Sequence, residues 1–271
     1  MEKNNYDKAL KLIGAVAEFP IIRVDRADFL RKQFADSPYI DRIISNGPQS
    51  VYTVESLRKK ADGVVKSCTN KTALISFVSG LPSNPALMVA LGGADVVQYF
   101  GFAINMAQQI AYLFGEDDLF DGDAGSFSEE AKMRIVAYLG AMFGAGGAAL
   151  LIARTSKIAG ANIGKKVAAK ALTKTAWYPL FKKVAAAVGQ KITKKTVEKT
   201  ITKAAPVVGG FISGGITYIT FRPMGNRIAD VFVKNLNGEF DNQLELNPEF
   251  AASLREQGGE IIDVEFSETD T

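Results

Sequence analysis

Asp95 is the residue of this chain whose surroundings most suggest chemistry. It is the only charged residue in segment 72–115, and a lone carboxylate in an apolar segment could relay protons or bind an ion. Gln98 and Asn105 follow on one helical face and complete a candidate buried polar site. A second interpretation makes Asp95 the N-cap of a helix, because it follows Gly92-Gly93 and has the spacing of a capping box. We favour the N-cap.

The residues that many enzymes use for nucleophilic and metal chemistry are missing. The chain has no histidine, which excludes Ser-His-Asp and Cys-His arrangements and histidine-ligated metals. Cys68 is the only cysteine, so no intrachain disulfide can form, as is typical of a reducing compartment. We therefore assign no catalytic residue, metal or cofactor. The weakest alternative is a hydrolase that uses carboxylates such as Asp95, Asp117 and Asp118.

Positive charge is concentrated between Arg154 and Lys203. This segment holds 13 Lys or Arg against one acid, whereas the segment from Asp230 to the end holds 11 acids against two bases. Basic helices with aromatic residues beside apolar segments suit an anionic membrane, at about 1 kcal/mol per basic residue near its surface. The candidate lipid-binding residues are Lys165, Lys166, Lys170, Lys174, Trp177, Lys182, Lys183, Lys191, Lys195 and Lys199. Nucleic acid is a competing partner that we do not favour, and a merely solvated face is the simplest alternative.

Two uncharged runs carry small residues at helical spacing. The first, IVAYLGAMFGAGGAALLIA over 135–153, predicts one hydrophobic helix, and the second covers 204–221. Small residues four apart let a second helix approach closely. The candidate helix-packing residues are Gly140 and Gly144 in the first run and Gly210 and Gly214 in the second.

The setting of the first run has two interpretations, and both stay open. In one, 96–115 and 135–153 form a membrane hairpin whose acidic loop, 116–130, is translocated while the basic residues after 153 remain in the cytoplasm. In the other, 135–153 is a core helix of a soluble bundle, where small residues serve the same close packing.

Helical periodicity dominates the chain and predicts an all-α, multi-helix bundle with Gly/Ala-rich hydrophobic helices. Amphipathic helices are expected over 5–18, 24–34 and 53–66, and a short one in 37–48 that ends at Asn46-Gly47-Pro48. We divide the chain into an N-terminal helical segment, 1–50, which packs on a helical core, 51–235, and an acidic tail, 236–271. The composition of the tail predicts disorder.

Five segments, in this order, resemble the EcsC family of bacterial proteins. They are VDRADFL (24–30), TALISFVSGLP (72–82), GADVVQYFGFAINMAQQIAYLFG (93–115), ALTKTAWYPLFKKVA (171–185) and APVVGGFISGGITYITFRPMGNRIAD (205–230). The family often has a glycine after LP, where this chain has Ser83-Asn84-Pro85. The resemblance implies a helical bacterial protein that is cytoplasmic or membrane-associated. The family has no established catalytic residues, so the resemblance transfers none.

The leading hypothesis is a non-enzymatic protein on the cytoplasmic face of the bacterial inner membrane. It would bind anionic lipid through the Lys-rich segment and the Gly-rich helices. The EcsC resemblance adds an ABC transporter or another membrane protein as a partner, because the family is named after a gene that lies beside those of such a transporter. The alternative from another class is a soluble helical carrier of a lipid or other apolar ligand.

Overall fold

The structure, a computed structural model, describes residues 22–78, 94–120, 129–156, 181–190 and 206–240, with a few residues of segment 7–14. In chain order its helices are α2 (Arg26–Gln33), α3 (Ile40–Asn46), the 3-10 helix η2 (Pro48–Ser50), α4 (Val54–Val78), α6 (Ala94–Leu113), α7 (Glu129–Met142), α8 (Ala148–Thr155) and α11 (Pro206–Leu236), and residues 181–190 form another. Within these ranges every regular element is a helix, which confirms the all-α bundle.

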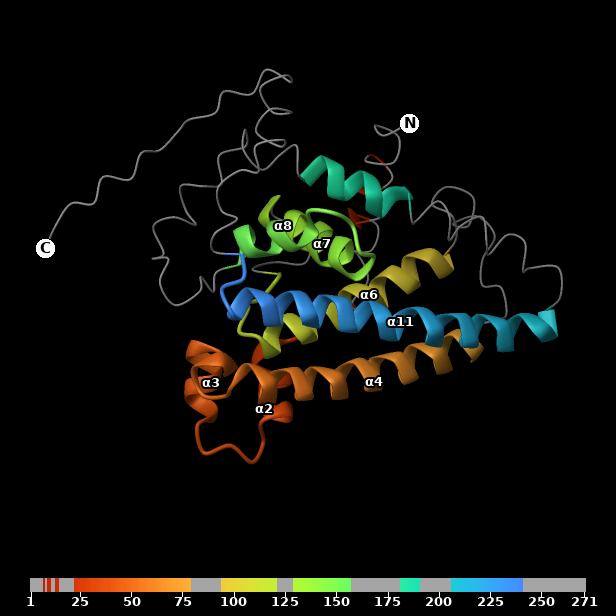
Figure 1. The fold of residues 1–271 in the computed structure, drawn as a ribbon. Helices are drawn as coiled ribbons and strands as arrows, with labels where there is room; N and C mark the ends of the chain where they lie inside the picture. Colours follow the sequence, from red (N-terminus) through yellow and green to blue (C-terminus); the bar gives the residue numbers. More distant parts are fainter. Residues whose placement is uncertain are drawn as a thin grey trace, which may run out of the picture.

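The long antiparallel pair of α4 and α11 forms one side of the molecule (Figure 1). Its direction follows from two contacts: Arg58 binds Asp230 with both N–O distances at 3.0 Å, while Val65 lies against Gly225. A Cβ placed on Gly225 would come within 2.6 Å of Val65 Cγ2. The absence of a side chain at Gly225 therefore lets α11 approach α4 closely.

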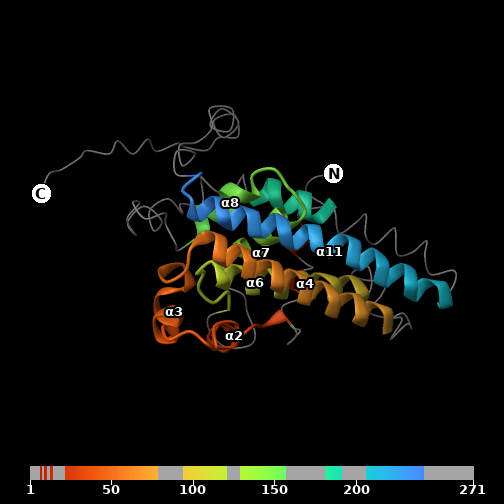
Figure 2. The same cartoon turned by 60° about the horizontal axis from the view of Figure 1, so that its bottom comes forward.

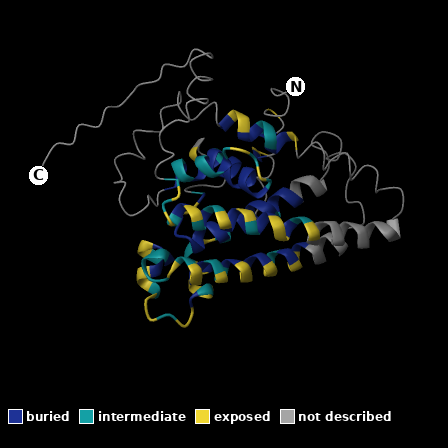
Figure 3. Ribbon diagram, in the orientation of Figure 1, coloured by how far each residue is buried: buried dark blue, intermediate teal, exposed yellow. Residues whose placement is uncertain are grey.

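Helix α6 lies behind this pair, and none of its residues from 99 to 113 is exposed, as the dark ribbon of Figure 3 shows. Aromatic side chains join it to α11. The Tyr99 and Phe221 rings meet edge-on with centroids 4.8 Å apart, and the Phe114 and Phe232 rings stack at 5.7 Å. Such ring pairs add roughly 0.5–1.5 kcal/mol each beyond the burial of their area.

The helices α2 and α3 pack below α4, as the rotated view in Figure 2 shows. Asp25 caps α2 by accepting a hydrogen bond from the Asp28 N–H at 2.7 Å. α3 ends at Gly47, whose φ of 81° suits glycine and is followed by Pro48. Both helices agree with the predictions for 24–34 and 37–48. Leu30 and Ile43 are fully buried, so the two helices contribute to the common core.

The prediction of one continuous helix over 135–153 is wrong. α7 ends at Met142, and the chain turns through Gly144 and Gly147, with φ of 70° and 88°, before α8 begins. Left-handed backbone at two positions interrupts the helical hydrogen bonds, and glycine accommodates it without strain. Among the described residues, no helix combines the length and hydropathy needed to cross a bilayer.

Gly140 remains at a close approach between helices despite this break. A Cβ there would clash with Cγ1 of Val184, in helix 181–190, and lie 3.0 Å from the Ala148 Cβ. Gly144 instead occupies the turn, where its left-handed φ matters more than its size. The predicted row of small residues therefore does not continue along a single helix.

Two alanine substitutions separate the packing effect from helix propensity. Gly140→Ala should lower the free energy of unfolding by about 1–2 kcal/mol, because overpacking outweighs the gain in propensity. Gly63→Ala, in the exposed face of α4 with no atom within 4 Å of the new Cβ, should raise it by about 0.5–1 kcal/mol. Urea unfolding measures both, and equal effects at the two positions would contradict the close packing at Gly140.

Candidate functional site

The most deeply buried charges among the described residues form an ion pair between Glu116 and Arg134. Glu116 follows the end of α6, Arg134 lies in α7, and their Oε2 and Nη2 atoms are 2.9 Å apart. The two side chains are only 1% and 3% exposed. Ser156, just after α8, donates a hydrogen bond to the other carboxylate oxygen of Glu116. One carboxylate therefore joins the ends of α6 and α8 to α7.

Arg134 has several further acceptors. Its guanidinium donates to the Tyr138 hydroxyl at 3.1 Å and to the backbone carbonyls of Asp117 and Asp118 at 3.3 Å, whereas its buried Nε has no partner. Burial raises the pKa of Glu116 above its ordinary value, and Arg134 opposes this shift. Burial lowers the pKa of Arg134, but Tyr138 and Glu116 more than compensate, so the guanidinium stays charged.

Arg26 extends the cluster to the N-terminal helices. Its Nε donates to the backbone carbonyl of Glu116 at 2.9 Å, and its Nη1 donates to the carbonyl of Ile44 at 2.7 Å. The cluster therefore fixes α2 and α3 against the end of α6 as well. The sequence analysis missed it, although an acid and an arginine at the edges of two apolar helices were a visible signal.

Removing the arginine should be costly because it leaves a buried carboxylate without its counter-ion. Arg134→Met is expected to lower the free energy of unfolding by about 3–5 kcal/mol at neutral pH. Arg31→Met is the matched control, since Arg31 pairs with Asp28 at an exposed site and surface substitutions of this kind usually stay within about 0.5 kcal/mol. A difference smaller than about 1 kcal/mol between the two variants would contradict the importance of the pair.

The cost should also depend on pH. Without Arg134, the pKa of Glu116 in the folded state rises further above its unfolded value, because burial then acts unopposed. A carboxyl with a raised folded pKa destabilises the protein as pH rises and the unfolded state ionises. The loss of unfolding free energy in Arg134→Met, relative to the wild type, should therefore be smaller at about pH 5 than at about pH 7. Chemical denaturation of the wild type and the variant at both pH values measures it.

The predicted polar site on α6 is only partly described. α6 begins at Ala94, which places Asp95 inside its first turn rather than at the N-cap, and the side chains of Asp95 and Gln98 lie outside the described part. Asn105 accepts a hydrogen bond from Gln109 Nε2 at 2.6 Å. Asp95 lies near one end of α6 and Asp117 follows the other end, with about 27 Å of helix between them. The proposed hydrolytic carboxylates are therefore not brought together.

Cys68 lies on α4 and faces Gln109 of α6. It forms a hydrogen bond with Gln109, and burial raises the pKa of its thiol to about 11 from an ordinary 9.0. Because the thiolate is the reactive form, an upward shift of this size lowers its population about 100-fold near neutral pH. Cys68 therefore suits packing better than nucleophilic chemistry.

This shift can be checked by alkylation with iodoacetamide at about pH 8. Cys68 in the folded protein should react about 100-fold more slowly than in urea-unfolded protein, with mass spectrometry as the readout. The folded rate should rise with pH up to about pH 11. Equal rates in the folded and unfolded proteins would show that the thiol is ordinary.

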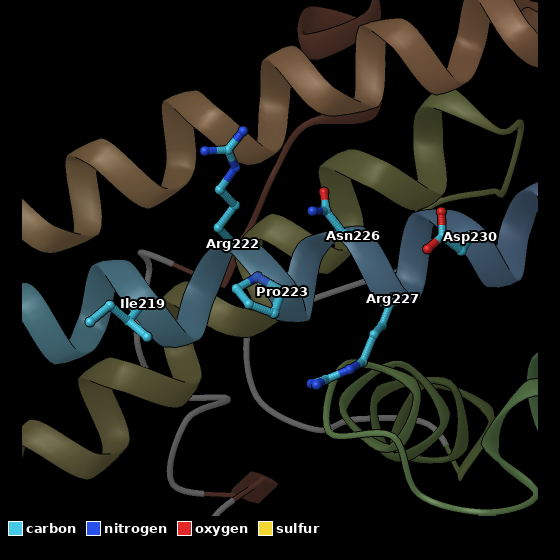
Figure 4. A pocket seen from close by; sticks show the side chains of 6 residues that line it. All are labelled: Ile219, Arg222, Pro223, Asn226, Arg227 and Asp230. Atoms are coloured by element: carbon cyan, nitrogen blue, oxygen red, sulfur yellow. The ribbon is translucent and has the colours of Figure 1, made fainter.

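A groove runs along the outer face of α11 (Figure 4). It has a volume of about 410 Å³ and is lined by Ile219, Arg222, Pro223, Asn226, Arg227 and Asp230. Arg222 points toward α4, whereas Arg227 points toward α7 and donates to the Met142 carbonyl at 3.1 Å. Arg222 makes no hydrogen bond or ion pair with the described residues.

The groove combines cations with apolar surface. Ile219 is 71% exposed, an unusual state for a large aliphatic side chain. Pro223 has no N–H, so the Ile219 carbonyl lacks its usual helical hydrogen bond. The groove is open and bordered by charges, unlike the dry pocket expected for a carried acyl chain. The sequence analysis assigned no role to any of its residues.

Two of the predicted lipid-binding lysines lie on helix 181–190. Lys182 and Lys183 are exposed, while Phe181, Val184 and Val188 are buried against the core. The other predicted residues of this surface, Lys165, Lys166, Lys170, Lys174, Trp177, Lys191, Lys195 and Lys199, lie outside the described residues. Gly210 and Gly214 lie within α11.

Comparison with known proteins adds no relative. No family model matches the chain, no curated protein matches it, and no solved structure matches it. The resemblance to the EcsC family therefore rests on the five sequence segments alone.

Proposed function

We propose that this chain is a non-enzymatic protein of the EcsC type that binds the cytoplasmic surface of an anionic bacterial membrane. The resemblance also suggests assistance to an ABC transporter or another membrane protein. The observation that carries the proposal is the charge segregation along the chain. The segment from Arg154 to Lys203 has 13 bases and one acid, a net charge of +12, and such a segment attracts anionic headgroups.

Helix 181–190 supports a surface mode of binding rather than deep insertion of this segment. Its apolar side chains pack on the core, with Val184 against α7, whereas Lys182 and Lys183 are exposed. The lysines can thus meet headgroups while the helix keeps its packing. The stretch 135–153 is equally engaged in the core, since Ile135, Leu139 and Leu151 are fully buried.

Vesicle co-sedimentation tests the proposal. Wild-type protein should bind phosphatidylglycerol-containing vesicles, should not bind pure phosphatidylcholine, and should be released by high salt, because screening weakens surface attraction. Lys182→Glu with Lys183→Glu should weaken binding about tenfold or more, at roughly 1 kcal/mol per lysine lost.

The matched control is Lys32→Glu with Lys59→Glu, which changes the net charge equally at exposed positions on α2 and α4. These substitutions should weaken binding clearly less than the pair on helix 181–190. Equal binding to anionic and neutral vesicles would overturn the proposal, and so would equal effects of the two charge reversals.

A further inference from the structure

The ends of three helices point toward one end of the bundle. The C-terminal end of α4 and the N-terminal ends of α6 and α11 extend to the same side of the molecule in both views (Figures 1 and 2). The contacts agree with this direction, since the Tyr99 hydroxyl, near the start of α6, donates to Thr220 at 3.4 Å and lies 3.2 Å from the Met224 sulfur, both in the middle of α11. Segments distant in sequence are therefore neighbours here.

These helix ends carry almost no charge. Residues 72–78 of α4 and 206–218 of α11, which we call the uncharged end, contain no Asp, Glu, Lys or Arg. At 1.5 Å per residue, the portion from α11 is about 20 Å long. Asp95, in the first turn of α6, is the one acid on the described helices at this end. The long apolar runs of the sequence are thus gathered in space.

A band of cations borders the uncharged end. Val65 lies opposite Gly225 in the antiparallel pair. Lys71 lies six residues after Val65 and Ile219 six residues before Gly225, so both lie at the same level, nearer the uncharged end. Lys66 and Lys71 are exposed on α4, as is Arg222 on α11. The first acids beyond this band are Asp62 on α4 and Asp230 on α11, and both bind Arg58.

We propose that the uncharged end inserts into one leaflet of an anionic bilayer, an inference that rests on the proposed membrane function. An apolar end bordered by lysine and arginine matches the change from acyl chain to anionic headgroup across the interface. Ile219, which is 71% exposed, adds an apolar side chain at the level of the cations. Half of a bilayer, headgroups included, is about 20 Å thick, so insertion of the whole uncharged portion of α11 places Arg222 and Lys71 among the phosphates.

This arrangement assigns different roles to two surfaces. The lysines of helix 181–190 supply attraction to the membrane, while the uncharged end supplies apolar contact and sets the orientation. The axis of α4 and α11 then points toward the bilayer, and α2 and α3 lie at the far end (Figure 1). Tyr39, 57% exposed just before α3, becomes the matched control for Ile219.

Fluorescence quenching locates the inserted end. Trp177→Phe removes the only tryptophan, and Ile219→Trp or Tyr39→Trp introduces one at either end of the protein. The vesicles contain phosphatidylglycerol and a lipid with a spin label near the headgroup. The lipid should quench the tryptophan at position 219 strongly and the one at position 39 hardly at all. Equal quenching at both positions overturns the inference.

Two aspartate substitutions test the contribution to affinity. Ile219→Asp should weaken vesicle binding about tenfold, because it places a charge in the interface, whereas Tyr39→Asp should leave binding within about twofold. Circular dichroism should show both variants folded, since both positions are exposed.

The outcomes separate this inference from the proposed function. Salt-sensitive vesicle binding without quenching at position 219 overturns insertion of this end and leaves the membrane function standing. If neither tryptophan variant nor the wild type binds anionic vesicles, both proposals fail. Binding that is unchanged in Ile219→Asp also contradicts the inference.

Discussion

The buried ion pair between Glu116 and Arg134 is the interaction on which the arrangement of the helices depends. Two charges that are almost fully withdrawn from water must be paired and hydrogen-bonded, or the fold loses several kcal/mol. Here the partners come from the end of α6, from α7 and from Ser156 after α8, and Arg26 adds the N-terminal helices. Because Glu116 and Ser156 lie just after α6 and α8, satisfying the pair fixes how the ends of these helices meet α7.

This constraint gives the bundle two unlike ends. Polar groups fix the C-terminal end of α6, while its N-terminal end lies beside the uncharged portions of α4 and α11. The two glycine-rich runs consequently play different parts: 135–153 is folded into the core as two short helices, whereas 206–218 continues the long helix α11 to the end of the molecule. Apolar sequence alone does not distinguish these situations. The position of each run in the fold does distinguish them. It moves the membrane hypothesis from α7 and α8 to α4 and α11.

Sequence signals that act within a few residues predicted short helices and their ends. They could not predict contacts between segments that are distant in the sequence. The apolar periodicity over 24–34 and the stop at Gly47-Pro48 act within a few residues, so α2 and α3 were predictable. The break after Met142 was missed because periodicity does not reveal that Gly144 and Gly147 adopt left-handed φ. The pairing of Glu116 with Arg134 depends on helices that meet only in the fold. The exposure of Ile219 was equally hidden, since an isoleucine in an uncharged run normally indicates burial.

Hydrogen–deuterium exchange in the presence and absence of phosphatidylglycerol vesicles tests most directly the claim that one end of this bundle meets an anionic membrane. The account predicts slower exchange on vesicle addition in 72–78 of α4 and 206–218 of α11, with α2 and α3 unchanged. Because the core around Arg134 is already buried, the exchange rate of α7 should also stay unchanged. Protection confined to α2 and α3, or none at the uncharged end while the protein is bound, would contradict the account.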